Sequence, residues 1–309
     1  MTPSGVRIAI SSCLVGERVR YDGGHKRDRY VVQTLARHVD LLPVCPEVGI
    51  GLGVPRPPIH LVRHRGAIRA VGVDDPTLDV TGPLVRYADR LSGTLGDVSG
   101  YIFKARSPSC GLRDVALAGE RGLARGIYAD AVVDAYPLLP AVDETALGDT
   151  ELRDNFLERV FVYRRWQDLI VAGVTARSLE AFHASHKLAL MAHSPRAVSE
   201  LGRLLARAHS PERVATRYIE GFMASMALPA TAARHENALL HALGYFKRDL
   251  DRASKSEAVD CVRRYHSGLI ARSRVLSLLR RHLRRHPHAY LSKQTYLYPD
   301  PHEKILRRL

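Results

Sequence analysis

Cysteine is scarce in this chain of 309 residues, and no disulfide framework can be built from it. There are four cysteines, and no two of them form a Cys-x-x-Cys pair. The first residues lack the basic-then-apolar layout of a secretory signal, so we expect reduced thiols and a cytoplasmic protein. Long apolar runs are missing too. No segment approaches about eighteen uninterrupted apolar residues, so no membrane span is expected.

The first half of the chain also lacks a dinucleotide-binding fingerprint, because no G-x-G-x-x-G follows its first apolar run. What it has is an alternation of short apolar runs and amphipathic stretches, which indicates an α/β domain whose mostly parallel sheet is covered by helices. Strands are predicted at 6–10, 41–44, 69–73, 101–105 and 138–142, and helices at 30–39, 81–95 and 126–135.

The second half reads almost entirely as helix, which predicts an all-α C-terminal domain. The segment 137–149 contains two prolines, a glycine and several acids, so we place the boundary there, with domains at 1–148 and 149–309. Helices are predicted at 152–167, 177–193, 196–208, 211–225, 230–251, 254–284 and 300–308.

Positive charge is distributed unevenly between the two halves. Residues 1–150 hold 18 Lys and Arg against 17 Asp and Glu, a net of +1, whereas residues 151–309 hold 28 against 15, a net of +13. A basic module of this kind is typical of polyanion binding, and we predict RNA as its partner. The alternative is a basic, solvated surface. The candidate phosphate contacts are Lys247, Arg248, Arg263, Arg264, Arg280, Arg281, Arg284, Arg285 and Lys293. Tyr290, Tyr296 and Tyr298 could stack on bases, although core packing is the ordinary role of most such tyrosines.

Three of the four cysteines stand where predicted strands end. They are Cys13, Cys45 and Cys110, each in a loop rich in Gly, Pro or Ser. Because ligands bind at the carboxyl ends of parallel strands, the three thiolates can meet there and form a soft-metal site that is one ligand short. The alternatives are three separate buried thiols, and the spacing does not separate zinc from iron–sulfur. Cys261 lies inside a predicted helix and is interpreted as packing.

Three further side chains are candidates for the chemistry of this site. Glu47 lies two residues after Cys45, where a carboxylate can act as a general acid or base, and its alternative role is a surface ion pair with Arg56. Ser107 and Ser109 flank Pro108 before the third cysteine. Either hydroxyl can hold a substrate carbonyl or thiocarbonyl, although loop capping is the ordinary role of such serines.

Taken together, the motifs S-C-L-V-G, V-R-Y-D-G-G-H-K, P-V-C-P-E, G-L-G-V-P-R and S-P-S-C-G resemble the thiouracil desulfidase family over about residues 6–145. The second half resembles a helical domain that is often fused to it, on stretches such as H-E-N-A-L-L-H-A-L-G-Y-F-K-R and Q-T-Y-L-Y-P-D-P. The combination resembles bacterial desulfidases that remove 4-thiouridine from tRNA.

The resemblance implies a [4Fe–4S] cluster with three cysteine ligands and one open iron. Carried onto this sequence, the ligands are Cys13, Cys45 and Cys110, Glu47 handles protons, and Ser107 is favoured over Ser109 as the participating serine. The predicted reaction is a non-redox hydrolysis that converts 4-thiouridine in tRNA to uridine and releases sulfide. Two alternatives stay open: a desulfidase for free thiouracil or thiolated nucleosides, whose helical half serves assembly, and a non-enzymatic RNA-binding or redox-sensing protein with a structural metal.

Overall fold

The computed structural model describes residues 5–309, apart from the side chain of Ser92. The chain divides into two compact units, Met1–Phe156 and Leu157–Leu309, which we describe separately. The division falls within the long helix α7 (Thr150–Ala172), a little beyond the boundary expected after residue 148.

The N-terminal unit is built on a four-stranded sheet in the order β2-β1-β5-β8. Its strands are β1 (Arg7–Ser11), β2 (Asp40–Val44), β5 (Gly100–Phe103) and β8 (Ala141–Asp143). All neighbouring strands are parallel, and the central strand β1 pairs with both β2 and β5. This arrangement confirms the predicted α/β class. Parallel strands bring the segments that follow β1, β2 and β5 to the same edge of the sheet.

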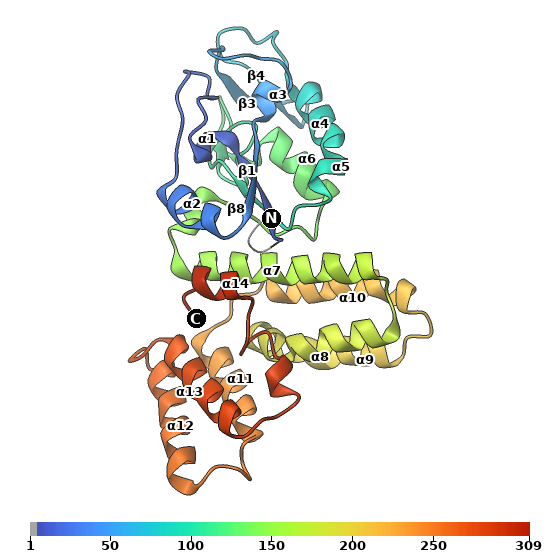
Figure 1. Ribbon diagram of the computed structural model, residues 1–309. Coiled ribbons are helices and arrows are strands. Elements are labelled where there is room, and N and C mark those ends of the chain that lie inside the picture. The colour runs from blue at the N-terminus through green and yellow to red at the C-terminus, as the bar shows by residue number, and fades with distance from the viewer. Residues whose placement is uncertain (1–4) are drawn as a thin grey trace. The chain divides into compact units, whose positions relative to one another are not determined.

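Helices cover both faces of this sheet. The connection from β1 to β2 runs through α1 (Ser12–Val15), α2 (Arg29–Gln33) and the 3₁₀ turn η1 (Leu35–Arg37). The later connections run back in the opposite direction through α4 (Thr81–Arg90), α5 (Ser92–Leu95) and α6 (Ile127–Ala135). Because parallel crossovers are right-handed, the two sets belong on opposite faces. Figure 1 shows α4, α5 and α6 together on one side of β1, with α2 on the other.

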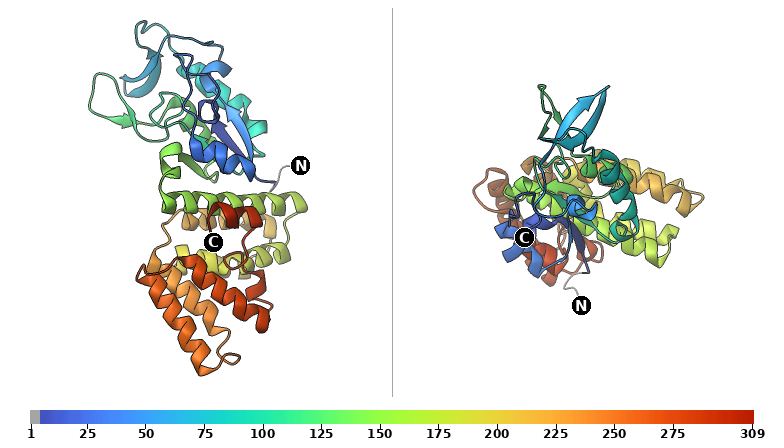
Figure 2. Two further views of the ribbon diagram at one scale, coloured as in Figure 1. Left: turned by 60° about the vertical axis from the view of Figure 1, so that its left-hand side comes forward. Right: turned by 90° about the horizontal axis from the view of Figure 1, so that it is seen from above.

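The strand predicted at 69–73 does not belong to the central sheet. It is β4 (Ala67–Gly72), which pairs antiparallel with β3 (Ile59–His64), a strand that the sequence analysis missed. The two are joined by Arg65 and Gly66, whose φ values of 49° and 84° fit the two-residue turn that hairpins favour. Arg-Gly is a weaker hairpin signal than Asn-Gly, which explains the miss. Figure 2 shows the hairpin standing out from the sheet.

Four short elements complete the N-terminal unit. They are α3 (Pro46–Gly49), β6 (Val115–Ala116), β7 (Leu123–Ala124) and the 3₁₀ turn η2 (Glu144–Leu147). Of these, α3 bears on the site, because it begins directly after Cys45 and carries Glu47 in its first turn.

The C-terminal unit is helical, as predicted. After α7 come α8 (Ala176–His193), α9 (Pro195–Ala206), α10 (Pro211–Met226), α11 (Ala232–Gly244), α12 (Arg252–His266), α13 (Arg272–Arg285), η3 (Leu291–Lys293) and α14 (Pro301–Leu306). The helix predicted at 254–284 is two helices. The chain breaks after Ser267, at Gly268, whose φ of 73° lies in the left-handed region. Within the described residues no helix is long and apolar enough to cross a bilayer.

A buried ionic network fastens the last helix of this unit. Arg307 contacts Glu158 and Glu303, in each case at 2.7 Å, and Glu303 also pairs with Arg165 at 2.6 Å. Burial disfavours the charged form of Glu158, but the neighbouring Arg307 and His193 outweigh it and hold the pKa of that carboxyl well below its usual range. The polar core of the unit is therefore ionised and paired, as buried charges must be.

Candidate active site

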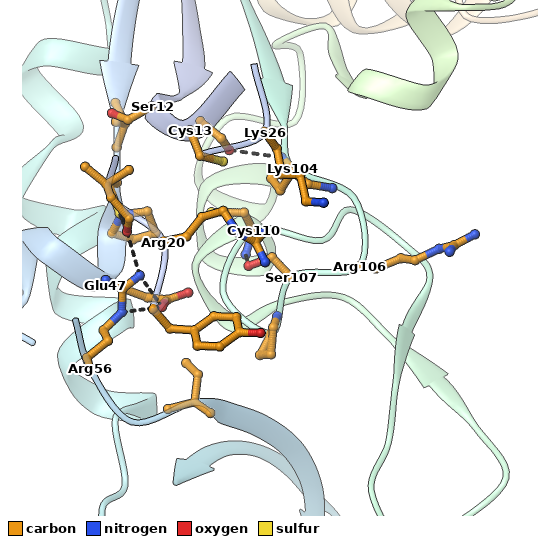
Figure 3. A pocket seen from close by; sticks show the side chains of 18 of the residues that line it. Ser12, Cys13, Arg20, Lys26, Glu47, Arg56, Lys104, Arg106, Ser107 and Cys110 are labelled. Carbon is orange, nitrogen blue, oxygen red and sulfur yellow. Dashed lines mark hydrogen bonds and ion pairs between the residues drawn. The ribbon is translucent and has the colours of Figure 1, made fainter. Parts of the chain in front are cut away.

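A pocket of about 470 Å³ opens at the carboxyl edge of the central sheet. Its lining comes from the segments that follow β1, β2 and β5, together with residues that precede β3. Strand β1 has β2 on one side and β5 on the other, so the connection that follows β1 and the connection that leads to β5 lie on opposite faces of the sheet. Ligands bind at such a switch point in open α/β folds. Figure 3 shows the pocket from close by.

The structure brings the three strand-end cysteines together around this pocket. Cys13 lies in α1, Cys45 is the N-cap of α3, and Cys110 lies in the loop after β5, and all three line the pocket. Cys13 and Cys110 are buried and Cys45 is partly buried. Cys261 is in α12 of the other unit, as expected.

These thiols are electrostatically coupled. Burial raises the pKa of the Cys13 thiol to about 11, against the opposing effect of Lys104 and with a further rise from Cys45. Burial likewise raises the pKa of Cys45, and raises that of Cys110 well above its ordinary value with added repulsion from Glu47 and Cys45. The thiols are thus uncharged unless a bound cation stabilises the thiolates.

The donor set fits a soft metal, since thiolate sulfur is the ligand that such metals select. In the part of the chain that the structure describes, no three Cys, His, Asp or Glu side chains converge on a position for one metal ion. A mononuclear zinc site has all its ligands on one atom, whereas in an iron–sulfur cluster the thiolates bind different irons. Three cysteines lining one pocket are a donor set of the kind that a cluster uses.

Glu47 extends into the same pocket and is held at both carboxylate oxygens. Oε2 accepts hydrogen bonds from Arg56 at 2.7 and 2.8 Å, and Oε1 accepts one from the hydroxyl of Ser109 at 2.9 Å. The side chain keeps 14% of its surface exposed, whereas that of Arg56 keeps only 3%. The pairing of Glu47 with Arg56 is therefore present, but it is a buried element of the pocket wall and not a surface ion pair.

Arg56 ties together three loops of the pocket. Besides Glu47, its guanidinium donates to the carbonyls of Gly53 and Val19, each at 2.9 Å. Sequence reasoning gave Arg56 no part in the site. The signal that could have found it is its place in the G-L-G-V-P-R motif, after the loop glycines Gly51 and Gly53, which have positive φ.

The two candidate serines occupy different positions. Ser107 lines the pocket, and its Oγ accepts from the backbone N–H of Cys110 at 3.1 Å and of Ser109 at 3.3 Å. Ser109 is fully buried and donates to Glu47. A Cβ on Gly126 would come within 2.8 Å of the backbone of both serines, so this loop is closely packed from behind.

Cations surround the pocket to an extent that the near-neutral charge of this half of the chain did not suggest. Arg20, Lys26, Lys104 and Arg106 are among the lining residues. Lys104 pairs with Glu144 and Arg20 lies 3.5 Å from Asp22. Among the described residues Lys26 and Arg106 have no ion pair, and Figure 3 shows Arg106 pointing away from the other labelled side chains. Lys104 and Arg106 were missed, although both follow β5 directly, where site residues are expected.

Most of the predicted RNA contacts are exposed, with one exception. Lys247, Arg248, Arg263, Arg264, Arg281, Arg284, Arg285 and Lys293 are exposed. Arg280 is buried, and its Nε donates to the carbonyl of Leu297, so its assignment to an RNA face was wrong. Its place in a run of basic residues concealed that it lies on the inner face of α13. Tyr296 is buried as well and donates or accepts a hydrogen bond at 2.8 Å with His235, which removes it from the stacking candidates.

Two protein-family models match the chain, one within each of its two compact units. Residues 8–144 match the family model described as 2-thiouracil desulfurase, and residues 187–301 match a family of unknown function, DUF1722. "Uncharacterized protein YbgA" of Escherichia coli (strain K12) is 26% identical over 146 residues, covering 46% of this chain and 86% of that protein. "Uncharacterized protein YbbK" of Bacillus subtilis (strain 168) is 26% identical over 161 residues, covering 48% of this chain and 98% of that protein.

A solved structure described as a [4Fe–4S]-dependent thiouracil desulfidase, TudS, is 29% identical, with a TM-score of 0.38, and the match covers 47% of this chain and 94% of that one. The family matches confirm the predicted resemblance: a domain like the thiouracil desulfidases is joined to a helical domain.

Proposed function

We propose that this protein is a [4Fe–4S]-dependent desulfidase that converts 4-thiouridine in tRNA to uridine and releases sulfide. The observation that carries the proposal is the convergence of Cys13, Cys45, Cys110 and Glu47 on one pocket, in the part of the chain that matches the 2-thiouracil desulfurase family. The volume of the pocket, about 470 Å³, suits a nucleotide-sized ligand.

The three pocket cysteines would hold the cluster, because they are the thiols that line the cavity and their donor chemistry suits iron–sulfur ligation. When bound, the cluster supplies a Lewis-acidic iron without a protein ligand, to which the soft sulfur of a thiocarbonyl is attracted.

Glu47 is positioned to act on water. Arg56 and Ser109 fix its two oxygens from the protein side, so the carboxylate is oriented before the substrate arrives. Oε1 accepts only one hydrogen bond from Ser109 and can accept a second, from a water molecule beside the thiocarbonyl carbon. Glu47 then takes a proton from that water as the oxygen bonds to the carbon.

The reaction is a hydrolysis, and its atoms balance without an oxidant or reductant. The water oxygen becomes the new carbonyl oxygen of the base, the C–S bond breaks, and sulfur leaves with the two protons of water as hydrogen sulfide. Ser107 accepts two backbone N–H groups, which leaves its own hydroxyl proton available to donate into the pocket toward the developing charge.

The charge distribution favours an RNA substrate. Lys26 and Arg106 provide positive charge beside the pocket, where a phosphate attached to the reacting nucleoside would lie. The net +13 of residues 151–309 would add the salt-dependent attraction that phosphate backbones experience. A thiolated base would have to leave its stack to enter the cavity.

A second candidate is a desulfidase for free thiouracil or thiolated nucleosides. It is favoured by the fact that every candidate chemical group lies in the N-terminal unit, which is the part that matches the thiouracil family. In that case the helical unit would serve assembly.

The deciding experiment is anaerobic incubation of the iron-loaded protein with tRNA that contains 4-thiouridine, followed by nucleoside analysis and sulfide measurement. We expect 4-thiouridine to be replaced by uridine with an equal amount of sulfide. Unmodified tRNA added to a reaction on free thiouracil should inhibit it, and raised salt should remove that inhibition. Conversion of thiouracil alone, indifferent to tRNA and to salt, would refute the tRNA substrate and leave the free-base enzyme.

A further inference from the structure

Four ring side chains form a cluster at the end of α11. Tyr245, which caps this helix, stacks on Tyr290 with centroids 5.0 Å apart and an angle of 28° between the ring planes. His288 meets Tyr245 edge-on at 4.9 Å, and His241, one helical turn earlier, does so at 5.6 Å. We call His241, Tyr245, His288 and Tyr290 the ring cluster.

The ring cluster remains accessible to solvent. Tyr245, His288 and Tyr290 are each half-buried, and His241 is exposed. Beneath the cluster the chain is fixed, because Phe246 is buried and its ring lies 6.2 Å from that of the buried His282 on α13. The rings are therefore held on a rigid base while part of their surface faces water. The exposed part of the rings is available for contact with a ligand.

Five exposed cations are close in the sequence to residues of the ring cluster. Lys247 and Arg248 follow Tyr245 almost immediately, and both are exposed. Arg284 and Arg285 end α13 just before His288, and Lys293 lies three residues after Tyr290, again exposed. Tyr245 contacts both His288 and Tyr290, so the two segments that carry these five cations meet at the ring cluster.

We infer that the ring cluster is a stacking platform for an unpaired nucleotide of RNA, with the bordering cations holding the phosphates on either side. Aromatic faces bind bases of any identity, and repeated cations follow the backbone. Two of the other predicted contacts are engaged in ion pairs: Arg281 pairs with Glu257 at 3.0 Å, and Arg263 lies 3.7 Å from Asp260. The inference rests on the proposed RNA substrate and locates where the helical unit would hold it.

The test measures RNA binding by the full-length protein and does not depend on desulfidation. One probe is a short single-stranded RNA with a central 2-aminopurine, whose fluorescence falls when the base stacks. The other is a fully paired RNA hairpin with the same number of phosphates. Tyr290→Leu is compared with Tyr290→Phe, which keeps the ring, and with Tyr298→Leu. Tyr298 was the other exposed candidate for base stacking, but it has no ring contact in the described part of the chain, so the platform assigns it no role.

We expect Tyr290→Leu to weaken binding of the single-stranded probe about 5- to 150-fold and to abolish the fluorescence change, since a stacked base is worth roughly that much. Tyr290→Phe and Tyr298→Leu should bind like the wild type, and the hairpin should not distinguish any of these variants. The double variant Lys247→Glu, Arg248→Glu should weaken both probes and flatten the salt dependence. The emission of Trp166, the single tryptophan, verifies that each variant is folded.

Unchanged affinity of Tyr290→Leu, or an equal loss in Tyr298→Leu, would overturn the platform. Either result would leave the proposed desulfidation of tRNA standing if nucleoside analysis still detects uridine. Conversely, the protein could stack the probe base and yet desulfurise only free thiouracil. That result would support the platform and refute the tRNA substrate.

Discussion

Lowering the pH from 7 to 5 should destabilise the helical unit strongly, because three of its histidines are buried in the neutral form. Burial lowers the pKa of His183 to about 4 and that of His186 to about 3. Burial, with the nearby Arg272, lowers the pKa of His235 to about 2. Each ring is engaged through Nδ1, with Tyr218, the Phe182 carbonyl and Tyr296 respectively.

The direction and size of the effect follow from proton binding in the two states. An unfolded histidine has a pKa of about 6.5 and is almost fully protonated at pH 5, whereas the folded rings stay neutral. The unfolded state therefore gains about one proton per histidine, which removes about 2 kcal/mol each and about 6 kcal/mol together between pH 7 and 5. Stability is present above pH 6.5 and is lost below it. Glu158, whose pKa lies well below its usual value, adds its own loss only at lower pH.

The chain contains its own reporter for this unit. Trp166 is the single tryptophan, it is buried, and its ring lies 5.5 Å from that of Phe182, which in turn contacts His186 at 4.2 Å. Urea unfolding followed by tryptophan emission at pH 7 and pH 5 therefore measures the helical unit by itself. A loss of about 6 kcal/mol is as large as the whole stability of many domains, so we expect a large fall in the urea midpoint.

Two variants test the assignment to the buried rings. His186→Leu should reduce the pH-dependent loss by about one third, since one of three proton-binding sites is gone. His209→Gln changes an exposed histidine between α9 and α10 and should leave the loss intact. Equal free energies of unfolding at pH 7 and pH 5, or an undiminished loss in His186→Leu, would refute the reasoning.

Three predictions concern the pocket. Cys13→Ser should lose both the visible absorbance of the cluster and sulfide release, while Cys261→Ser keeps both; retained iron in Cys13→Ser would contradict the ligand assignment. Glu47→Gln should keep the absorbance but lower turnover about 10²- to 10⁴-fold, and a fully active variant would exclude it as the base. In Gly49→Ala the added Cβ would lie 2.2 Å from the ring of Tyr87. Because Gly49 is in α3, the helix that carries Glu47, we expect this clash to impair sulfide release. Tyr87→Ala in the same chain should restore part of the activity.

The sequence predicted those parts of the fold that rest on regular local patterns. The apolar runs that became β1, β2, β5 and β8 and the long amphipathic helices were found, because buried strands and helix faces carry periodic signals. The hairpin β3–β4 was missed, and the helix at 254–284 was predicted without its break at Gly268. In both places one or two residues with positive φ decide the structure. Arg65 in particular is not a residue type from which a positive φ would be predicted.

The candidate site was predicted in part for a related reason. Cys13, Cys45 and Cys110 were found because strand ends in a parallel sheet share an edge, a rule that needs no tertiary detail. The contacts of Arg56 and Ser109 with Glu47 join residues 9 and 62 positions apart in the chain, and they depend on how the loops pack. Burial of Arg280 was equally hidden, since only the orientation of α13 separates it from the exposed Arg281.

The pocket is held in shape by groups other than its cysteines. Arg56 joins the loops of Val19 and Gly53 to Glu47, and Ser107 closes the turn that carries Cys110. In small zinc domains the metal supplies the free energy of folding, because few other contacts exist. Here a packed sheet and these hydrogen bonds line the cavity, so we expect the proposed cluster to bind a preformed site. The same wall holds Glu47 by both carboxylate oxygens, so its orientation does not depend on a bound ligand.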